Sequence, residues 1–258
     1  MKSDKRLLVI FGLVAVAGSG LMMMPPIKQD SAYHLFADTR RIAGIPHCFN
    51  VVSNAPFLFI GLAGIRQITL GNWLGSSSTI KYLFMVFFTG LVLTGLGSSY
   101  YHLHPDNFTL VWDRIPMTIA FTAFFCLVVA ECISHHLAIR LLSPLLVMGL
   151  FSVLYWYQTE INGHGDLRPY LLIQFLPVVL IPLILGLYKA NSKCCAYVWA
   201  VLGFYVMAKI AESFDSQLYH SLIIVSGHTI KHLLAGMGTY FIYRKLLSHT
   251  ANTAINDQ

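Results

Sequence analysis

Charged side chains are scarce in this sequence. They make up 11% of its 258 residues, whereas a soluble globular domain carries about 25%. Apolar residues account for 56%. This composition excludes an ordinary soluble domain and indicates a protein that lies largely in lipid.

Cysteine is also rare, and the five cysteines include no CxxC pair. Neither a disulfide framework nor a thiolate metal site is therefore expected. Lys and Arg outnumber Asp and Glu by 17 to 11, but they are scattered over short loops and form no basic tract. Nucleic acid is therefore not an expected partner, and the basic residues instead report topology.

Long hydrophobic runs, by contrast, are abundant. A helix crosses a bilayer with about 20 apolar residues, and a spanning backbone must satisfy its own hydrogen bonds. Eight such windows lie near residues 6–24, 50–70, 80–102, 109–131, 136–157, 168–188, 195–213 and 227–247. Because the alternating pattern of a β-barrel is missing, we predict an all-α integral membrane protein: a seven-transmembrane helix bundle plus one extra N-terminal hydrophobic helix.

The first window has two interpretations. A basic start, a short apolar run and the small residues Ala15 and Ala17 are typical of a signal peptide, but the same segment could stay as an anchor. We expect four parts: an N-terminal signal-anchor or signal peptide (1–24), an outer loop (25–48), the seven-helix core (49–249) and a polar tail (250–258).

The loop charges predict the orientation. Most basic residues fall in alternate loops on the side of the N-terminus, which the positive-inside rule places in the cytoplasm. Both termini are then cytoplasmic if the first helix is retained. Most acidic residues and histidines fall at the opposite, periplasmic or lumenal, ends of the spans, so a functional site is expected there.

Three predicted helix ends deliver polar side chains to one layer of the membrane. "SGHTIKHLLAG" opens the last span with His228 and His232, "GSSYYHLHPDN" closes an earlier one with Ser98 and His102, and Asp113 stands in the first turns of the next. His228 and His232 are four residues apart, so they share a helix face about 6 Å apart. A third imidazole would complete a three-ligand zinc site, with Asp113 available for proton transfer.

Other polar residues have plainer explanations. Asp113 and Arg114 could form an ion pair at a helix start, and Lys231 could reach the headgroups or pair with Glu212 or Asp215. His104 is a reserve ligand at most. The remaining histidines are expected to be interfacial: His34, His47, His135, His136, His164, His220 and His249.

The order of these motifs resembles the CREST superfamily of membrane hydrolases: Ser-x-x-x-His, then an Asp opening the next helix, then His-x-x-x-His. Within it, the chain is most similar to the alkaline ceramidases and their bacterial relatives. The stretches that carry the resemblance are "GIPHCFNVVSNAPFLFIGL" (44–62), "GSSYYHLHPDNFTLVWDRIPM" (97–117) and "SGHTIKHLLAG" (226–236).

The resemblance implies that His102, His228 and His232 bind Zn²⁺, that Asp113 handles the proton of the attacking water, and that Ser98 holds that water or the developing oxyanion. The reaction would be hydrolysis of the amide of a ceramide-like N-acyl lipid drawn from the bilayer. One departure concerns calcium. The family's acidic cluster is reduced here to Asp38, so no equivalent calcium site is expected.

Three other functions stay open at this point. The same superfamily includes receptor-like proteins, so the chain could bind a lipid without hydrolysing it. A haem-binding electron carrier is disfavoured because His228 and His232 point to one side of one helix and no CxxCH motif is present. A transporter is disfavoured because the charges cluster at one end of the spans.

Overall fold

The computed structural model describes residues 5–71, 73, 77–188 and 192–255, most of which are helical. In chain order the elements are α1 (Lys5–Met23), the 3-10 turn η1 (Ser31–His34), α2 (Cys48–Val52), α3 (Ala55–Leu70), α4 (Ser78–Leu103), α5 (Asn107–Cys132), α6 (His135–Ile161), α7 (Arg168–Tyr188), α8 (Ser192–Ser213), α9 (Asp215–Leu222) and α10 (Gly227–Ile255).

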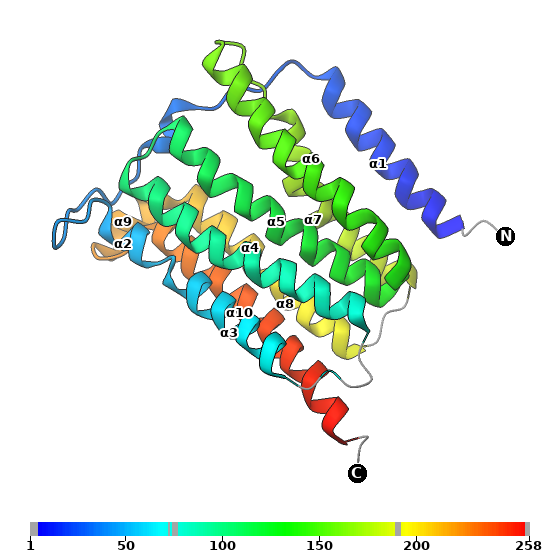
Figure 1. Ribbon diagram of the computed structural model, residues 1–258. Coiled ribbons are helices and arrows are strands. Elements are labelled where there is room, and N and C mark those ends of the chain that lie inside the picture. The colour runs from blue at the N-terminus through cyan, green and yellow to red at the C-terminus, as the bar shows by residue number, and fades with distance from the viewer. Residues whose placement is uncertain (1–4, 72, 74–76, 189–191, 256–258) are drawn as a thin grey trace.

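Seven segments of the described chain are long and apolar enough to cross a membrane: Lys5–Met23, Cys48–Leu70, Ser78–Leu103, Asn107–Cys132, His135–Ile161, Arg168–Tyr188 and Cys195–Ser213. They coincide with the first seven predicted windows, which confirms an all-α, multi-pass membrane protein. The last window lies in α10, which has 29 residues and is richer in polar side chains. Figure 1 shows α10 running lengthwise beside α3, and it also contacts α8.

The two ends of the bundle differ. The short helices α2 and α9 gather at one end, whereas the described ends of the chain, at Lys5 and Ile255, lie at the other (Figure 1). Helix α1 runs along the outside of the bundle, contacts α7 and buries only Ile10. The predicted placement of both termini on one side is consistent with this arrangement.

The window predicted as one helix over 50–70 is interrupted, and the cause is Pro56. Proline has no backbone N–H, and its ring clashes with the carbonyl four residues earlier. That carbonyl belongs to Val52, the last residue of α2. The chain turns through Ser53 and Asn54 before α3 begins. This break places the buried polar side chains of Asn50, Ser53 and Asn54 within an otherwise apolar segment.

Helix α5 begins with a reciprocal cap. The Asp106 carboxylate accepts a hydrogen bond from the Thr109 backbone N–H at 2.6 Å, and the Thr109 hydroxyl accepts one from the Asp106 N–H at 3.1 Å. The cap fixes where the helix starts and therefore the depth of Asp113. Gly97 lets α4 approach α5 there, since a Cβ at Gly97 would overlap the Trp112 carbonyl.

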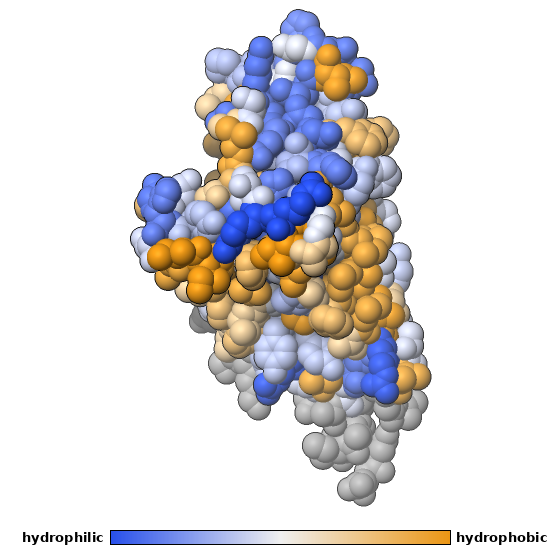
Figure 2. Space-filling model, turned by 90° about the vertical axis from the view of Figure 1, so that its left-hand side faces the viewer, coloured by the Kyte–Doolittle hydropathy of each residue, from blue (hydrophilic) through white to orange (hydrophobic). Residues whose placement is uncertain are grey.

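The packing is that of a helix bundle in lipid. Large side chains such as Phe84, Phe88 and Ile184 fill the interior, whereas Phe59 and Phe151 are more than half exposed. Exposed apolar surface of this extent is expected where a protein faces acyl chains. Figure 2 views the end that carries α2 and α9 and shows hydrophilic side chains across it, with hydrophobic ones on the flanks.

Candidate metal centre

Three buried histidines from two helices meet near this end of the bundle. His102 lies at the end of α4, and His228 and His232 lie in the first two turns of α10. Each has at most 5% of its surface exposed, and one potential ligand nitrogen from each lies within 4.8 Å of the others. The structure therefore brings together the three residues that the sequence predicted as metal ligands.

The spacing of the ring nitrogens suits a metal ion. The Nε2 atoms of His102 and His228 are 3.3 Å apart. Two nitrogen ligands of a tetrahedral zinc ion, each about 2.0–2.1 Å from the metal, are separated by roughly 3.3 Å. Three buried imidazoles also form the donor set that catalytic zinc sites use. The residues thus fit a bound zinc ion.

The break between α2 and α3 orients His232. The Ser53 hydroxyl donates to the Asn50 carbonyl at 3.0 Å, and its oxygen lies 2.8 Å from Nδ1 of His232. With the single hydroxyl proton directed to Asn50, the Ser53 oxygen accepts from Nδ1 of His232. The lone pair is then on Nε2, as a metal ligand requires.

Asn50 also holds the first turn of α10. Its side-chain oxygen accepts a hydrogen bond from the Thr229 hydroxyl at 2.7 Å. Thr229 stands between the two histidines of α10, so this bond fixes their helix face against α2. The short helix α2 therefore positions the metal ligands through Asn50 as well as through the neighbouring turn.

The outer loop and α9 close over the histidines. Asp215 accepts hydrogen bonds from the backbone N–H groups of His228, at 2.6 Å, and Ala37, at 2.9 Å. The buried ring of Phe36 packs edge-on against His102 and His228, with ring centroids 4.7 and 4.6 Å apart. These contacts exclude water from the loop side of the cluster.

Ser98 and Asp113 lie beside the cluster, as the sequence predicted. Both are almost fully buried. Together with His232 they line one cavity of about 320 Å³. The proton-transfer candidate, the Ser98 hydroxyl and one of the candidate ligands therefore face the same space.

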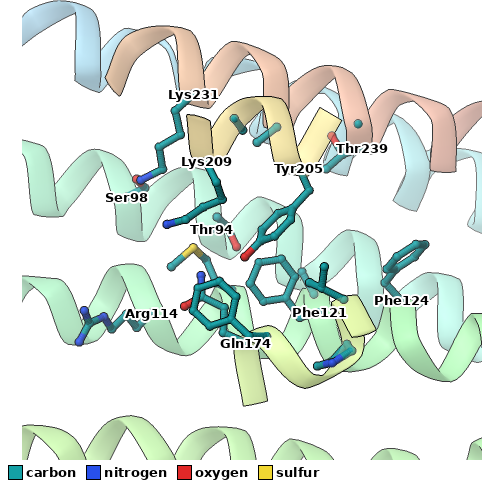
Figure 3. A pocket seen from close by; sticks show the side chains of 18 of the residues that line it. Thr94, Ser98, Arg114, Phe121, Phe124, Gln174, Tyr205, Lys209, Lys231 and Thr239 are labelled. Carbon is teal, nitrogen blue, oxygen red and sulfur yellow. The ribbon is translucent and has the colours of Figure 1, made fainter. Parts of the chain in front are cut away.

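This cavity is polar at one end and apolar at the other. Figure 3 shows Ser98, Arg114 and Lys231 at one end and Phe124 and Thr239 at the opposite end. Phe124 lies ten residues beyond Arg114 on α5, which corresponds to about 15 Å of helix. Most of the lining is apolar and includes Phe57, Phe87, Leu91, Phe121, Ile181 and Ile242. The space has the form expected for an acyl chain with a polar group attached.

An ion-pair network forms one wall. The Glu212 carboxylate accepts a hydrogen bond from Lys231 at 2.5 Å and pairs with Lys209 through its other oxygen. Of the alternatives considered for Lys231, the pair with Glu212 is the one that forms. The possible pair of Asp113 and Arg114, in contrast, is absent from the described residues, where Arg114 contacts aromatic rings instead.

Several histidines outside the cluster differ from expectation. His104, the reserve ligand, is exposed. His34 and His47, which were expected to be interfacial, are half-buried and hydrogen-bonded within the protein. His34 binds the Tyr101 hydroxyl and the Asn107 side chain, each at 2.9 Å, and Nδ1 of His47 lies 3.0 Å from the His102 carbonyl oxygen. Four others are exposed as predicted: His135, His136, His164 and His220.

Asp38, the acid considered in the sequence for a calcium site, is engaged by Arg40. The guanidinium donates to both of its carboxylate oxygens, at 2.8 and 2.7 Å. Burial by itself would raise the pKa of Asp38, but hydrogen bonds from the Arg40 side chain and backbone hold that pKa below its usual value. The carboxylate is therefore ionised and neutralised within its own loop.

Sequence reasoning missed the residues that support the histidines: Phe36, Asn50, Ser53 and Asp215. A signal for two of them was present, since Asn50, Ser53 and Asn54 are polar residues next to a proline within an apolar window. No local pattern marks Phe36 or Asp215, because their contacts with α10 join segments that are distant in the sequence.

Comparison with known proteins leaves the family open. No family model matches the chain. An 80-residue stretch, 31% of the chain, is 30% identical to Protein NRT1/ PTR FAMILY 2.7 of Arabidopsis thaliana. Protein NRT1/ PTR FAMILY 2.6 of the same plant matches with the same identity and length. The match covers 14% of each of these proteins, so this chain is similar to a small part of them.

Proposed function

We propose that this protein is a zinc-dependent membrane amidohydrolase that cleaves the amide bond of ceramide-like N-acyl lipids into a free fatty acid and an amine. The observation that supports this most strongly is the position of His102, His228 and His232. They form a metal-type cluster beside Asp113 and Ser98, at the polar end of a largely apolar cavity.

The three histidines would hold the zinc ion. When bound, zinc would lower the pKa of a coordinated water molecule and polarise a carbonyl group. The hydrogen bond of His232 with Ser53 keeps that ring in the tautomer and orientation that binding needs. Phe36 and the Asp215 contacts keep bulk water away from this side.

Asp113 is placed to move the proton of the hydrolysis. Its carboxylate accepts a proton as a water oxygen forms a bond to the amide carbon, and it returns the proton to the nitrogen as the C–N bond breaks. Ser98, which lines the same cavity, offers its hydroxyl to the substrate carbonyl oxygen. The amine then leaves as a neutral molecule, and the Asp113 carboxylate is free of the proton again.

The substrate would enter from the bilayer, with its acyl chain in the apolar part of the cavity. The clustering of acidic residues and histidines at one end of the spans supports a site on the outer, periplasmic or lumenal, side. Both termini, at the other end of the bundle, would then be cytoplasmic.

A hydrolysis assay tests this proposal. Purified protein in detergent is incubated with a fluorescent N-acyl sphingosine, and release of the fatty acid is compared for wild type, Asp113→Asn and His104→Ala. The exposed His104 serves as the matched control. Asp113→Asn should lose activity by about 10²- to 10⁴-fold, whereas His104→Ala should match wild type. Zinc-loaded wild type that binds N-acyl lipids without cleaving any would instead indicate a lipid-binding or receptor-like protein.

A further inference from the structure

Arg114 is a buried cation that the proposed hydrolysis does not use. Its side chain lines the cavity and is only 5% exposed. Its guanidinium carbon lies over three aromatic rings, 4.1 Å from the centroid of Trp156, 4.7 Å from that of Tyr170 and 5.7 Å from that of Tyr33. These rings fix the plane of the guanidinium and partly compensate its lost hydration.

The donors of Arg114 are largely unused. Nη2 donates to the Gln29 side-chain oxygen at 2.6 Å, and the Gln29 backbone N–H in turn donates to Glu160. Nη1 is buried and has no hydrogen-bond partner among the described residues. Because an arginine offers five N–H donors and a buried donor is costly to leave unpaired, the site is incomplete without a ligand.

The charges along the cavity point to an anionic ligand. The Lys, Arg, Asp and Glu side chains that line it are the bases Arg114, Lys209 and Lys231 and the acids Asp113 and Glu212. The bases outnumber the acids, and Glu212 pairs with both lysines. Arg114 is thus the base of the lining that forms no ion pair with a carboxylate among the described residues. A planar guanidinium suits a carboxylate or phosphate, which it can bind through two parallel hydrogen bonds.

The position of Arg114 assigns this anion to one part of the substrate. Ser98 and Asp113 mark where the amide would react, and the apolar lining extends away from them toward Phe124 (Figure 3). Arg114 is at the polar end, next to Gln29 and Tyr33 of the outer loop. A lipid with its acyl chain among the apolar residues would place its amine portion there.

We infer that Arg114 binds an anionic oxygen, carboxylate or phosphate, on the amine portion of the lipid, so that the protein prefers acidic N-acyl lipids over neutral ones. The inference rests on the proposed function for the division of the substrate into an acyl and an amine portion. Gln29 orients the guanidinium from the loop side. The carboxylate or phosphate would complete the hydrogen bonding of Nη1.

A binding experiment tests the inference without requiring turnover. In an Asp113→Asn background, affinities are measured from ligand-dependent thermal stabilisation for N-palmitoylglycine, N-palmitoyl-phosphoethanolamine, neutral N-palmitoylethanolamine and inorganic phosphate alone. The two acidic lipids should bind about 10- to 100-fold more tightly than the neutral one, as expected for charge-assisted hydrogen bonds.

Substitutions then locate the effect. Arg114→Gln should abolish the preference while the neutral lipid binds as before, which also shows that the variant is folded. Arg114→Lys, which keeps the positive charge but loses the planar guanidinium group, should retain part of the preference for acidic lipids. The control is Arg41→Gln, an exposed arginine of the outer loop, which should keep the full preference.

Three results would overturn the inference: equal affinity for acidic and neutral lipids, a preference that survives Arg114→Gln, or stabilisation by inorganic phosphate equal to that by the acidic lipids, which would assign the site to a free anion. The proposed function is judged separately. If the wild-type protein hydrolysed neutral and acidic lipids at equal rates, the inference alone would be refuted. If acidic lipids bound in an Arg114-dependent way but the wild-type protein, which keeps Asp113, hydrolysed none of them, the proposed function alone would be refuted.

Discussion

Replacing Gly97 with alanine should lower the proposed hydrolytic activity strongly while leaving the three candidate metal ligands in place. A Cβ at this position would lie 2.8 Å from the Trp112 carbonyl carbon and closer still to its oxygen. Carbon atoms in contact normally lie about 3.5–4.0 Å apart, so α4 and α5 would have to separate by roughly 1 Å. That shift moves Asp113, on α5, relative to Ser98 on α4.

The expected magnitudes follow from this displacement. Overpacking between well-packed helices costs about 1–3 kcal/mol, and a misplacement of about 1 Å in an active site can lower turnover by roughly 100-fold. The three histidines of the proposed zinc site lie on α4 and α10, which the α4–α5 displacement does not separate. Gly97→Ala should therefore bind zinc, unfold at a lower temperature than wild type and hydrolyse N-acyl lipids about 100-fold more slowly.

The matched control is Gly203→Ala. Gly203 is an exposed residue within α8, and a Cβ there meets nothing within 4 Å. Alanine in an open helical position stabilises by about 0.5–1 kcal/mol, so this variant should unfold at a slightly higher temperature and keep full activity. Thermal unfolding, zinc content and turnover are measured for both variants. Wild-type activity and unfolding temperature in Gly97→Ala would refute the reasoning.

Three further predictions concern the surroundings of the site. Ser53→Ala should weaken zinc binding by about 10- to 100-fold, because His232 loses the partner that sets its tautomer; an unchanged zinc affinity in a competition titration with a chelator would contradict this. Glu212→Gln should destabilise the protein by about 3–5 kcal/mol because two lysines lose their shared carboxylate, and denaturation at the wild-type temperature would argue against the network. Hydrogen bonds with Arg168 lower the pKa of Asp166 in the folded protein. The stability that this ion pair contributes is therefore present above the unfolded-state pKa of about 3.9 and is lost as the pH falls through the folded-state pKa. Asp166→Asn should therefore reduce the fall of the unfolding temperature at acid pH, and a fall as steep as that of wild type would count against the pair.

The helices and their depths were predictable from the sequence because they depend on local properties. Hydropathy and length placed the seven apolar segments. The rise of a helix placed Ser98, His102, Asp113, His228 and His232 in one layer. The hydropathy of residues 50–70 does not reveal the break at Pro56, although a proline within a helix predicts one. These features depend on residues that are close together along the chain, so the sequence alone is enough to predict them.

Lateral packing was not predictable in the same way. Whether Arg114 pairs with its neighbour Asp113 or enters an aromatic cage depends on Trp156 and Tyr170, which come from α6 and α7. The closure of Phe36 over the histidines likewise depends on the path of a loop. No hydropathy pattern encodes which helices become neighbours, so the residues around the site emerged only from the fold.

The most direct test of the central claim is the metal content of the purified protein, measured by elemental analysis on wild type, His228→Ala, His232→Ala and the control His104→Ala. A single three-histidine zinc site predicts about one zinc ion per chain in wild type and in the control. It predicts loss of zinc from both of the other variants. Folded wild-type protein that holds no zinc even after supplementation, or zinc retained in both His228→Ala and His232→Ala, would contradict it.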